Sequence, residues 1–238
     1  VKGSKGLSHV IPTPGTPIMM ARANRLSSAR DILEKIGTCA VEYKYDGLRL
    51  QAHKKGDEIT MYSRNLEVMT PMFPDIEEAI LKQVKADSVI FEGEIVAYNP
   101  NTGVFVPFQE TMQRKRKYDI ESKALEIPVK LFAFELLYVD GKSMLDEPYE
   151  VRKKELKKIL IMGNTIVYAE ESIASSESEI EKMFTDSVSK HFEGIIAKKP
   201  EGIYEAGMRG WNWIKFKKAM SKKLMDTVDV LVMGYTKG

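Results

Sequence analysis

The first residues that could carry out chemistry are three charged side chains at two-residue spacing, Glu42, Lys44 and Asp46. Successive side chains of a β-strand point to opposite faces, so in a strand these three would share one face. A lysine held on a rigid strand can act as a nucleophile. Three charges on one strand face are also typical of an exposed sheet, so this segment alone leaves both interpretations open.

Later segments that resemble strands also carry charged residues on an apolar background. Glu92 and Glu94 would share a face of one strand, Glu193 begins another, and Lys215 and Lys217 would share a face of a third. Carboxylates can hold a divalent metal ion, lysines can neutralise phosphate oxygens, and one lysine can attack phosphorus. Each segment alone is typical of a solvated strand face, but together they predict phosphoryl or nucleotidyl transfer.

The chemistry sets a condition on Lys44, which can attack only as a free amine although the pKa of a lysine is ordinarily about 10.4. Glu42 and Asp46 would raise the pKa of Lys44, whereas neighbouring lysines and a bound Mg²⁺ would lower it. We therefore expect Lys215, Lys217 and a metal ion to activate it. The sequence has no GxxxxGK[ST] loop and no GxGxxG fingerprint, so the nucleotide must be held by another device.

The composition excludes several other kinds of site. The 238 residues carry a net charge of +2, so any nucleic-acid contact must be local. The single cysteine, Cys39, excludes an intramolecular disulfide and a multi-cysteine zinc site. No apolar run approaches membrane-spanning length, so we expect no membrane partner. A hydrophobic fraction of 43% is sufficient for the core of one large domain.

The elements that must position these residues alternate between helices and strands. Hydrophobic spacing predicts helices that begin near Ala29, Pro74 and Pro148, and a capping box from Ser176 to Glu179 predicts another. Alternating segments predict strands over 41–46, 48–53, 59–63, 89–98, 130–139, 193–199, 211–218 and 228–233. Mixed order and hairpins together indicate an α+β domain with mostly antiparallel sheets.

Residues 44–49, Lys-Tyr-Asp-Gly-Leu-Arg, resemble the K-x-D-G-x-R motif of ATP-dependent DNA ligases, RNA ligases and mRNA capping enzymes. Five such motifs in one order are more specific than any single match. The run 107–117 is similar to archaeal and eukaryotic-type replicative DNA ligases in particular. The other four motifs are 92–94 (Glu-Gly-Glu), 134–138 (Phe-Glu-Leu-Leu-Tyr), 193–198 (Glu-Gly-Ile-Ile-Ala-Lys) and 213–217 (Trp-Ile-Lys-Phe-Lys).

The resemblance implies an ATP-grasp-like adenylation domain with two mostly antiparallel sheets, flanking helices and a nucleotide pocket between the sheets. Lys44 would attack the α-phosphate of ATP, release pyrophosphate and hold AMP, which then passes to the 5′-phosphate of a nick that is sealed. The other implied roles are adenine reading by Glu42, stacking by Phe134, ribose or phosphate contacts by Arg49, Arg64 and Glu94, phosphate contacts by Lys198, Lys215 and Lys217, and binding of Mg²⁺ (or Mn²⁺) by Glu193 and Glu94.

Some assignments within the resemblance stay open. Regular alternation places Lys198 on the face opposite Glu193, so either the strand is bulged or Lys198 has another role. Phe134 could equally be a core aromatic. We expect Asp46 to be structural or adjacent to the metal ion, and Glu92 to matter less. Glu135 stands where many relatives have aspartate, which should have little effect.

The resemblance also implies domain boundaries and partners. Residues 1–20 would be a linker from an N-terminal DNA-binding domain, 21–222 the adenylation domain and 223–238 the start of an OB-fold domain. The partners would be nicked duplex DNA and a sliding clamp, the latter reached through a part of the protein outside this chain. We expect a monomer, cytoplasmic or, in a eukaryote, nuclear. This chain alone should adenylate itself weakly yet could seal a pre-adenylated nick.

A basic run of four residues predicts a local DNA contact, or else a solvated helix face. Two further functions remain as alternatives. The first is an RNA ligase or a capping-type nucleotidyltransferase. The second, from another class, is a non-catalytic nucleic-acid-binding module that uses the basic run. The run consists of Arg114, Lys115, Arg116 and Lys117.

Overall fold

The computed structural model describes residues 11–114, 120–161 and 163–217. The strands are β1 (Arg22–Arg25), β2 (Cys39–Lys44), β3 (Leu48–Lys55), β4 (Glu58–Ser63), β5 (Ser88–Ala97), β6 (Val129–Val139), β7 (Lys142–Ser143), β8 (Ile166–Tyr168), β9 (Glu171–Ala174), β10 (Gly194–Lys198) and β11 (Arg209–Lys217). The helices are α2 (Ala29–Ile36), α3 (Pro74–Gln83), α4 (Phe108–Thr111), α5 (Ile120–Glu126), α6 (Tyr149–Ile159) and α7 (Glu177–Ser189), with 3₁₀ turns η1 (Thr70–Met72) and η2 (Met112–Arg114).

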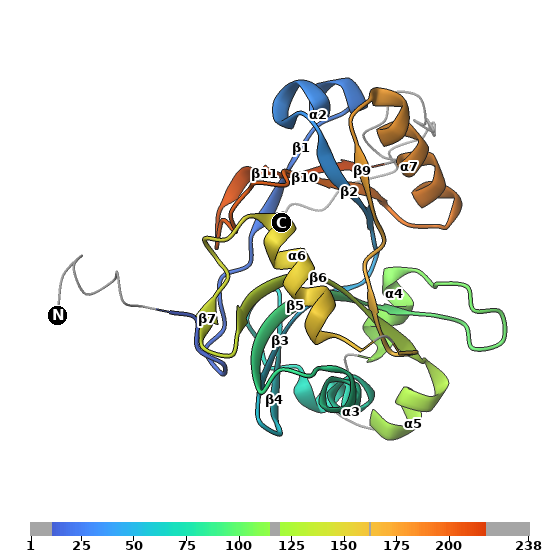
Figure 1. Ribbon diagram of the computed structural model, residues 1–238. Helices are drawn as coiled ribbons and strands as arrows, with labels where there is room; N and C mark the ends of the chain where they lie inside the picture. The colour runs from blue at the N-terminus through green and yellow to red at the C-terminus, as the bar shows by residue number, and fades with distance from the viewer. Residues whose placement is uncertain (1–10, 115–119, 162, 218–238) are drawn as a thin grey trace, which may run out of the picture.

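These strands form two sheets, with helices on the outer side of each (Figure 1). The five-stranded sheet has the order β1-β11-β10-β2-β9, and the six-stranded sheet has the order β4-β3-β5-β6-β7 with β8 beside β6. Only the pairs β1–β11 and β6–β8 are parallel among the described strands. The expected α+β fold with two mostly antiparallel sheets is therefore confirmed.

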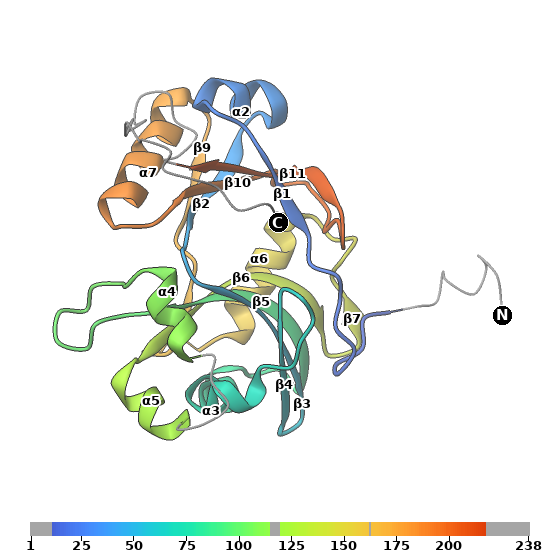
Figure 2. The same cartoon turned by 180° about the vertical axis from the view of Figure 1, so that it is seen from behind.

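The five-stranded sheet packs its outer face against α2 and α7, which Figure 2 shows from behind. Ile32 of α2 and Phe184 of α7 are buried there against Ile214 and Phe216 of β11. The rings of Phe184 and Phe216 stack with centroids 4.2 Å apart. The predicted capping box begins α7, since the Ser176 hydroxyl accepts from the backbone of Glu179 and the Glu179 carboxylate accepts in return. The two helices thus leave the inner face of this sheet for the site.

The six-stranded sheet packs its outer face against α3. Ile76 and Ile80 of α3 are buried with Phe91 of β5 and Leu131 of β6 in one apolar cluster. The predicted hairpin is present as β3 and β4, and Gly56 in its turn has a positive φ of 56°. The period-two pattern of both strands therefore places their apolar residues against α3.

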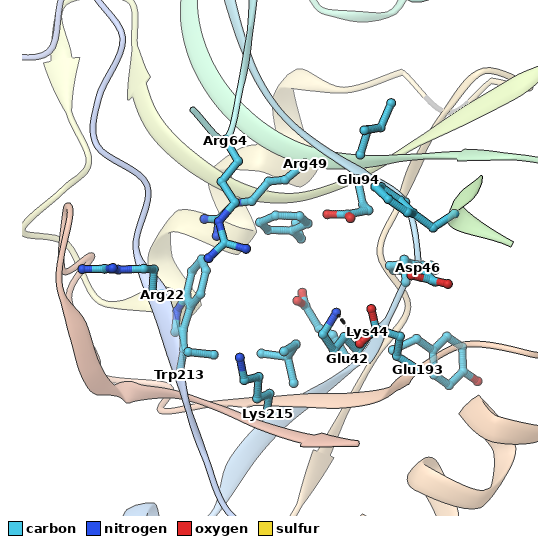
Figure 3. A pocket seen from close by; sticks show the side chains of 18 of the residues that line it. Arg22, Glu42, Lys44, Asp46, Arg49, Arg64, Glu94, Glu193, Trp213 and Lys215 are labelled. Atoms are coloured by element: carbon cyan, nitrogen blue, oxygen red, sulfur yellow. Dashed lines mark ion pairs between the residues drawn. The ribbon is translucent and has the colours of Figure 1, made fainter. Parts of the chain in front are cut away.

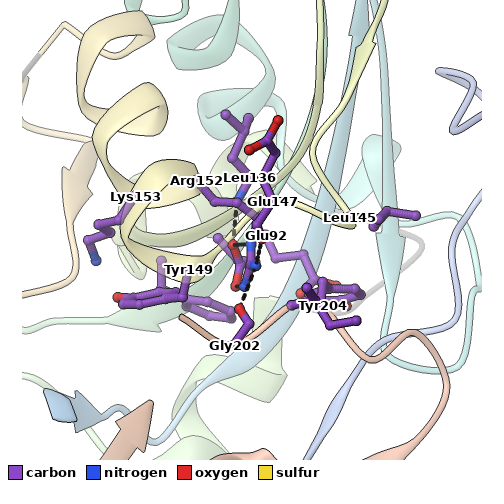
Figure 4. Close-up of polar contacts among 12 residues, drawn as sticks. Glu92, Leu136, Leu145, Glu147, Tyr149, Arg152, Lys153, Gly202 and Tyr204 are labelled. Carbon is purple, nitrogen blue, oxygen red and sulfur yellow. Dashed lines mark hydrogen bonds and ion pairs between the residues drawn. The ribbon is translucent and has the colours of Figure 1, made fainter. Parts of the chain in front are cut away.

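Helix α6 lies alongside β5 and β6 of the six-stranded sheet (Figure 1). Its hydrophobic spacing predicts an inward face, and Leu156 is indeed buried. Two charged residues of α6, Arg152 and Lys153, are buried as well. Arg152 pairs bidentately with Glu135 of β6 at 2.7 and 2.8 Å and donates to the carbonyl of Gly202 at 2.9 Å, as Figure 4 shows around Arg152. Helix α6 is therefore joined to the body by buried polar contacts.

Of the linker expected over 1–20, residues 1–10 lie outside the described residues, whereas the part nearest β1 contacts the six-stranded sheet. The Ile18 amide donates to Gln51 Oε1 at 2.7 Å, and the Gly15 amide donates to His53 Nδ1 at 3.0 Å. Gly15 and Ile18 thus bind the segment before β1 to the six-stranded sheet. The predicted strand over 228–233 lies outside the described residues. Within the described ranges, no helix is long and apolar enough to cross a membrane.

Candidate active site

A cavity of about 500 Å³ lies between the two sheets, and Figure 3 shows the side chains that line it. Its walls come from strands of both sheets, which brings together residues more than 170 positions apart in the sequence. Every residue to which the resemblance assigned the metal or the nucleotide lines this cavity: Glu42, Lys44, Arg49, Arg64, Glu94, Phe134, Glu193, Lys198, Lys215 and Lys217.

Lys44 stands at the end of β2, and its Nζ lies 3.1 Å from Glu193 Oε2. Lys217 of β11 forms an ion pair with the same carboxylate oxygen. The sheet register explains this meeting, because Gly194 is the partner of Lys44 on one side and of Lys217 on the other. Burial, then the nearby charge of Lys217, lowers the pKa of Lys215, which lines the cavity beside them. Both lysines predicted to activate Lys44 therefore line the same cavity as Lys44.

The backbone conformation of Gly194 explains how Glu193 and Lys198 can both face the cavity. Its φ is +141°, and a Cβ built at Gly194 would overlap the carbonyl oxygen of Phe216. The strand is therefore irregular at its first residue, and simple alternation does not extend back to Glu193. As a result, Glu193 and Lys198 both line the cavity.

Carboxylates gather near Lys44 (Figure 3). Burial, followed by a hydrogen bond and charge repulsion from Glu193, raises the pKa of Asp46. Burial raises the pKa of Glu94 to about 7. For Glu193, burial alone would raise the pKa, but Lys44 and Lys217 lower it overall. The environment of Asp46 and Glu94 thus disfavours their charged forms, and a bound cation would stabilise those forms.

A metal ion can be tested against this donor set. Among residues 11–114, 120–161 and 163–217, no three His, Cys, Asp or Glu side chains form a ready-made metal cluster. Mg²⁺ usually keeps several waters and takes only one or two carboxylates together with substrate phosphates. The oxygen donors of Glu193 and Glu94 therefore fit a Mg²⁺ ion that arrives with a polyphosphate.

At the other end of the same strand face, Glu42 is only 3% exposed. Its Oε1 lies 2.5 Å from Lys153 Nζ and accepts from the Tyr149 hydroxyl at 2.8 Å, and its Oε2 lies 2.6 Å from Lys198 Nζ. Burial alone would raise the pKa of Glu42, but the two lysines lower it overall. Glu42 is therefore an ionised acceptor in the cavity wall.

Lys198 is bound at this end of the cavity. Besides Glu42, its Nζ contacts the Phe134 carbonyl at 3.2 Å and lies 4.7 Å from the ring centroid of Trp213. Gly194, which pairs with Lys44, is four residues away, about 13 Å along a strand. The structure therefore engages Lys198 with Glu42 and with the rings of Phe134, Tyr149 and Trp213. It does not place Lys198 with the lysines around Lys44, where the resemblance implied a phosphate contact.

Arg49 is held by a residue of the neighbouring strand β5 and by the segment before β1. Its guanidinium pairs with Glu92 at 2.7 Å and donates to the Ala21 carbonyl at 2.7 Å. The same group lies 5.6 Å from the Phe134 ring centroid and 5.4 Å from that of Trp213. Glu92, which the sequence ranked low, is thus the buried support of Arg49.

Sequence reasoning missed several lining residues. Arg22 and Arg209 line the cavity as direct partners in the β1–β11 pair, and β1 was not predicted. Ile196 lines the cavity between Gly194 and Lys198 in β10. Simple alternation from Lys198 would have found Ile196, but no sequence signal indicated that Arg22 would meet Arg209.

One prediction for DNA binding is wrong. Arg114 is 2% exposed, and its guanidinium pairs with Asp75 at 2.7 and 3.1 Å and donates to the Ile127 carbonyl at 2.8 Å. These contacts bury the arginine in the six-stranded half, so it is a structural residue and not a DNA contact. Lys115, Arg116 and Lys117 lie outside the described residues.

Comparison with known proteins shows the family to which this chain belongs. Residues 19–217 match the family described as "ATP dependent DNA ligase domain". The chain is 47% identical over 242 residues to a DNA ligase of Sulfophobococcus zilligii, covering 100% of this chain and 40% of that protein. It is 45% identical over 236 residues to a probable DNA ligase of Dictyoglomus thermophilum, covering 99% of this chain and 40% of that protein. The chain thus spans about 40% of the length of these curated relatives.

Solved structures share the fold at low sequence identity. A mycobacterial DNA ligase D complexed with ATP and MES has a TM-score of 0.63 at 23% identity, covering 84% of this chain and 60% of that one. A Chlorella virus DNA ligase-adenylate has a TM-score of 0.60 at 18% identity, covering 88% of this chain and 70% of that one. Both likenesses concern the arrangement of the two sheets and their helices.

Proposed function

The chain belongs to the ATP-dependent DNA ligase family as its adenylation domain, and from this premise we propose that Lys44 forms a covalent lysyl-AMP. The Lys44 amine attacks the α-phosphorus of ATP and loses a proton, a P–N bond forms, and the bond to the pyrophosphate oxygen breaks. The observation that carries the proposal is the position of Lys44, which lines the intersheet cavity with Lys215, Lys217 and Glu193.

The charges of the cavity support a polyphosphate ligand. Its lining holds eight basic side chains and four acidic ones, although the whole chain has a net charge of only +2. A surplus of cations inside a low-dielectric cleft attracts a polyanion and stabilises charge that develops on phosphate oxygens. The basic residues are Arg22, Lys44, Arg49, Arg64, Lys198, Arg209, Lys215 and Lys217, and the acidic ones are Glu42, Asp46, Glu94 and Glu193.

We assign the remaining roles by position. Phe134 stacks on the base, Arg49 and Arg64 contact ribose or phosphate, and Lys215 and Lys217 contact the α-phosphate. Glu193 and Glu94 hold Mg²⁺ or Mn²⁺, which when bound supplies charge neutralisation at the phosphates. In this structure Lys44 Nζ lies 3.1 Å from Glu193 Oε2.

We further propose that the protein passes AMP from Lys44 to the 5′-phosphate of nicked duplex DNA. In that step the P–N bond breaks and a P–O–P bond forms. The 3′-hydroxyl then attacks the 5′-phosphate and releases AMP. We expect a cytoplasmic monomer and a sliding clamp as a partner. Because relatives are more than twice as long as this chain, we also expect residues 1–238 alone to adenylate themselves weakly.

The test is incubation of the full-length protein with α-labelled ATP, followed by denaturing electrophoresis and acid treatment. Wild type should retain an acid-labile label, and Lys44→Ala should lose it. Residues 1–238 run in parallel should label more slowly. A label that persists in Lys44→Ala would remove Lys44 from the covalent step, and efficient labelling of residues 1–238 would contradict the expected weakness.

The same experiment separates the alternatives. A capping-type enzyme would take its label from GTP, and an RNA ligase would seal nicked RNA in preference to nicked DNA. A non-catalytic binding module would take no label and would lose no activity in Lys44→Ala. The family match over residues 19–217 favours the DNA ligase.

A further inference from the structure

We propose that Lys153 and Tyr149 of α6 are positioning residues for Glu42. Together with Lys198 they leave its carboxylate a single open acceptor, which selects a purine carrying a 6-amino group. This inference rests on the proposed function, since it concerns the base end of the same cavity. Neither α6 residue lines that cavity, so both act through Glu42.

The number of acceptor positions on Glu42 carries the inference. An ionised carboxylate offers about four lone-pair positions, two on each oxygen. Lys153 and the Tyr149 hydroxyl, whose hydrogen is shared with Glu171, face Oε1, and Lys198 occupies one position on Oε2. One acceptor on Oε2 remains, on a side chain that lines the cavity and is almost shielded from water.

Each donor to Glu42 is itself held in place. The single hydrogen of the Tyr149 hydroxyl is shared between Glu42 Oε1 and Glu171, and burial raises the pKa of Tyr149, so this hydroxyl stays a donor. Lys153 also contacts the Ala169 carbonyl at 3.3 Å and lies 3.7 Å from Glu171. Burial alone would lower the pKa of Lys153, but Glu42 and Glu171 raise it, so the lysine stays charged.

The open acceptor distinguishes two classes of purine. A 6-amino group donates a hydrogen bond to the carboxylate, whereas the 6-oxo group of hypoxanthine or guanine would set one acceptor against another. A hydrogen bond to a charged group is favourable, whereas an unpaired buried acceptor is costly. The difference in binding free energy should favour the 6-amino purine over the 6-oxo purine by about tenfold or more in affinity. Phe134 and Trp213, close to Lys198, bound the same end of the cavity.

Removal of the Lys153 charge should change the nature of this acceptor. With only Lys198 left to oppose burial, Glu42 in Lys153→Met would gain a proton more readily and could then donate to a 6-oxo group. Discrimination in Lys153→Met should therefore fall as pH decreases, whereas wild type should be insensitive to pH. The charged and titratable groups that face Glu42 or its partners are Lys153 and Tyr149 of α6, Lys198 of β10, Glu171 of β9, Glu135 of β6, and Tyr45 after β2.

The test measures binding of AMP and of IMP to the full-length protein by calorimetry between pH 6 and 8. We expect Lys153→Met to lower the ratio of AMP to IMP affinity about tenfold at pH 6 and less at pH 8. Lys153→Arg should restore most of the wild-type ratio. Tyr149→Phe removes only a hydroxyl, so it should lower the ratio severalfold at every pH and serves if Lys153→Met does not fold.

Asp75→Asn is the matched control, because it breaks another buried ion pair, with Arg114, away from the cavity. It should cost stability and leave the AMP to IMP ratio unchanged. A wild-type ratio in both Lys153→Met and Tyr149→Phe would overturn the inference, as would the same loss in Asp75→Asn. Labelling with ATP is scored separately, so absence of lysyl-AMP with the expected binding ratios would contradict the proposed function and leave the inference supported.

Discussion

At the scale of single residues, the conformation of Gly194 determines whether Glu193 can reach Lys44. The Glu193 amide donates to the Lys44 carbonyl at 3.0 Å, and the carboxylate of Glu193 pairs with Lys44 and Lys217. Both contacts depend on a backbone that turns at φ +141°, next to the Phe216 carbonyl. Only glycine combines that φ with that close approach.

Gly194→Ala should therefore destabilise the protein by about 3 kcal/mol or more, because the overlap with Phe216 adds to the strained φ. Gly103→Ala is the matched control, since Gly103 has φ +70° but nothing within 4 Å of a built Cβ, and it should cost about 1–2 kcal/mol. Urea unfolding measures both changes. Equal losses in the two variants would show that the close approach to Phe216 is unimportant.

At the scale of elements, the segment before β1 is attached to β3 by buried polar groups. His53 accepts from the Gly15 amide through Nδ1, so its Nε2 carries the proton and donates to Gln51 Oε1 at 2.9 Å. Gln51 in turn accepts from the Ile18 amide, and the Ala21 carbonyl accepts from Arg49. Attachment of this segment is thus linked to Arg49, which lines the cavity between the two sheets.

His53 predicts how this attachment responds to pH. Burial lowers the pKa of His53 to about 4, below the value of about 6.5 for an unfolded chain. A neutral His53 therefore contributes stability above pH 6.5 that is lost as pH falls toward 4, up to about 3 kcal/mol. Urea unfolding at pH 7 and pH 4.5 should show this loss, and His53→Asn, which keeps an acceptor without a titrating ring, should reduce it. An equal loss in His53→Asn would assign the pH dependence to other groups.

At the scale of the whole molecule, two separate apolar cores support the two sheets, one between α3 and the six-stranded sheet and the other beneath α2 and α7. The cavity takes its lining from both sheets. Polar contacts also join the halves, including Lys198 to the Phe134 carbonyl at 3.2 Å and the Tyr204 hydroxyl to Glu92 at 3.0 Å. A nucleotide in the cavity would therefore contact both halves.

ATP should accordingly stabilise both sheets together. In Lys44→Ala, which cannot form the covalent bond, ATP at a hundredfold excess over its Kd should raise the free energy of unfolding by about 2.7 kcal/mol. Hydrogen exchange should slow in peptides from β2 and β10 as well as in those from β3 and β5. Inosine triphosphate at the same concentration should protect less. Protection confined to one sheet would contradict a site shared by both.

The sequence by itself was sufficient for much of the fold and nominated a set of charged residues that line one cavity. Periodicity predicted the β3–β4 hairpin, α3 and the capping box of α7. Alternation separated Lys215 from the buried Ile214, and the order of motifs nominated Lys44 together with residues that now line one cavity. These signals are local, since they depend on which side chains share a face and on spacing along the chain.

Only the tertiary structure decided what each face meets. Arg114 belongs to a basic run in the sequence but is buried against Asp75, and Lys153 lies 111 positions from the Glu42 carboxylate that it binds. A charged side chain beside a distant partner has the same local pattern as one in water. Its burial depends on a long-range pairing that periodicity does not contain. For that reason Lys44 and Glu42 could be nominated from the order of motifs along the sequence, whereas the groups that hold Glu42 in place could be found only in the folded chain.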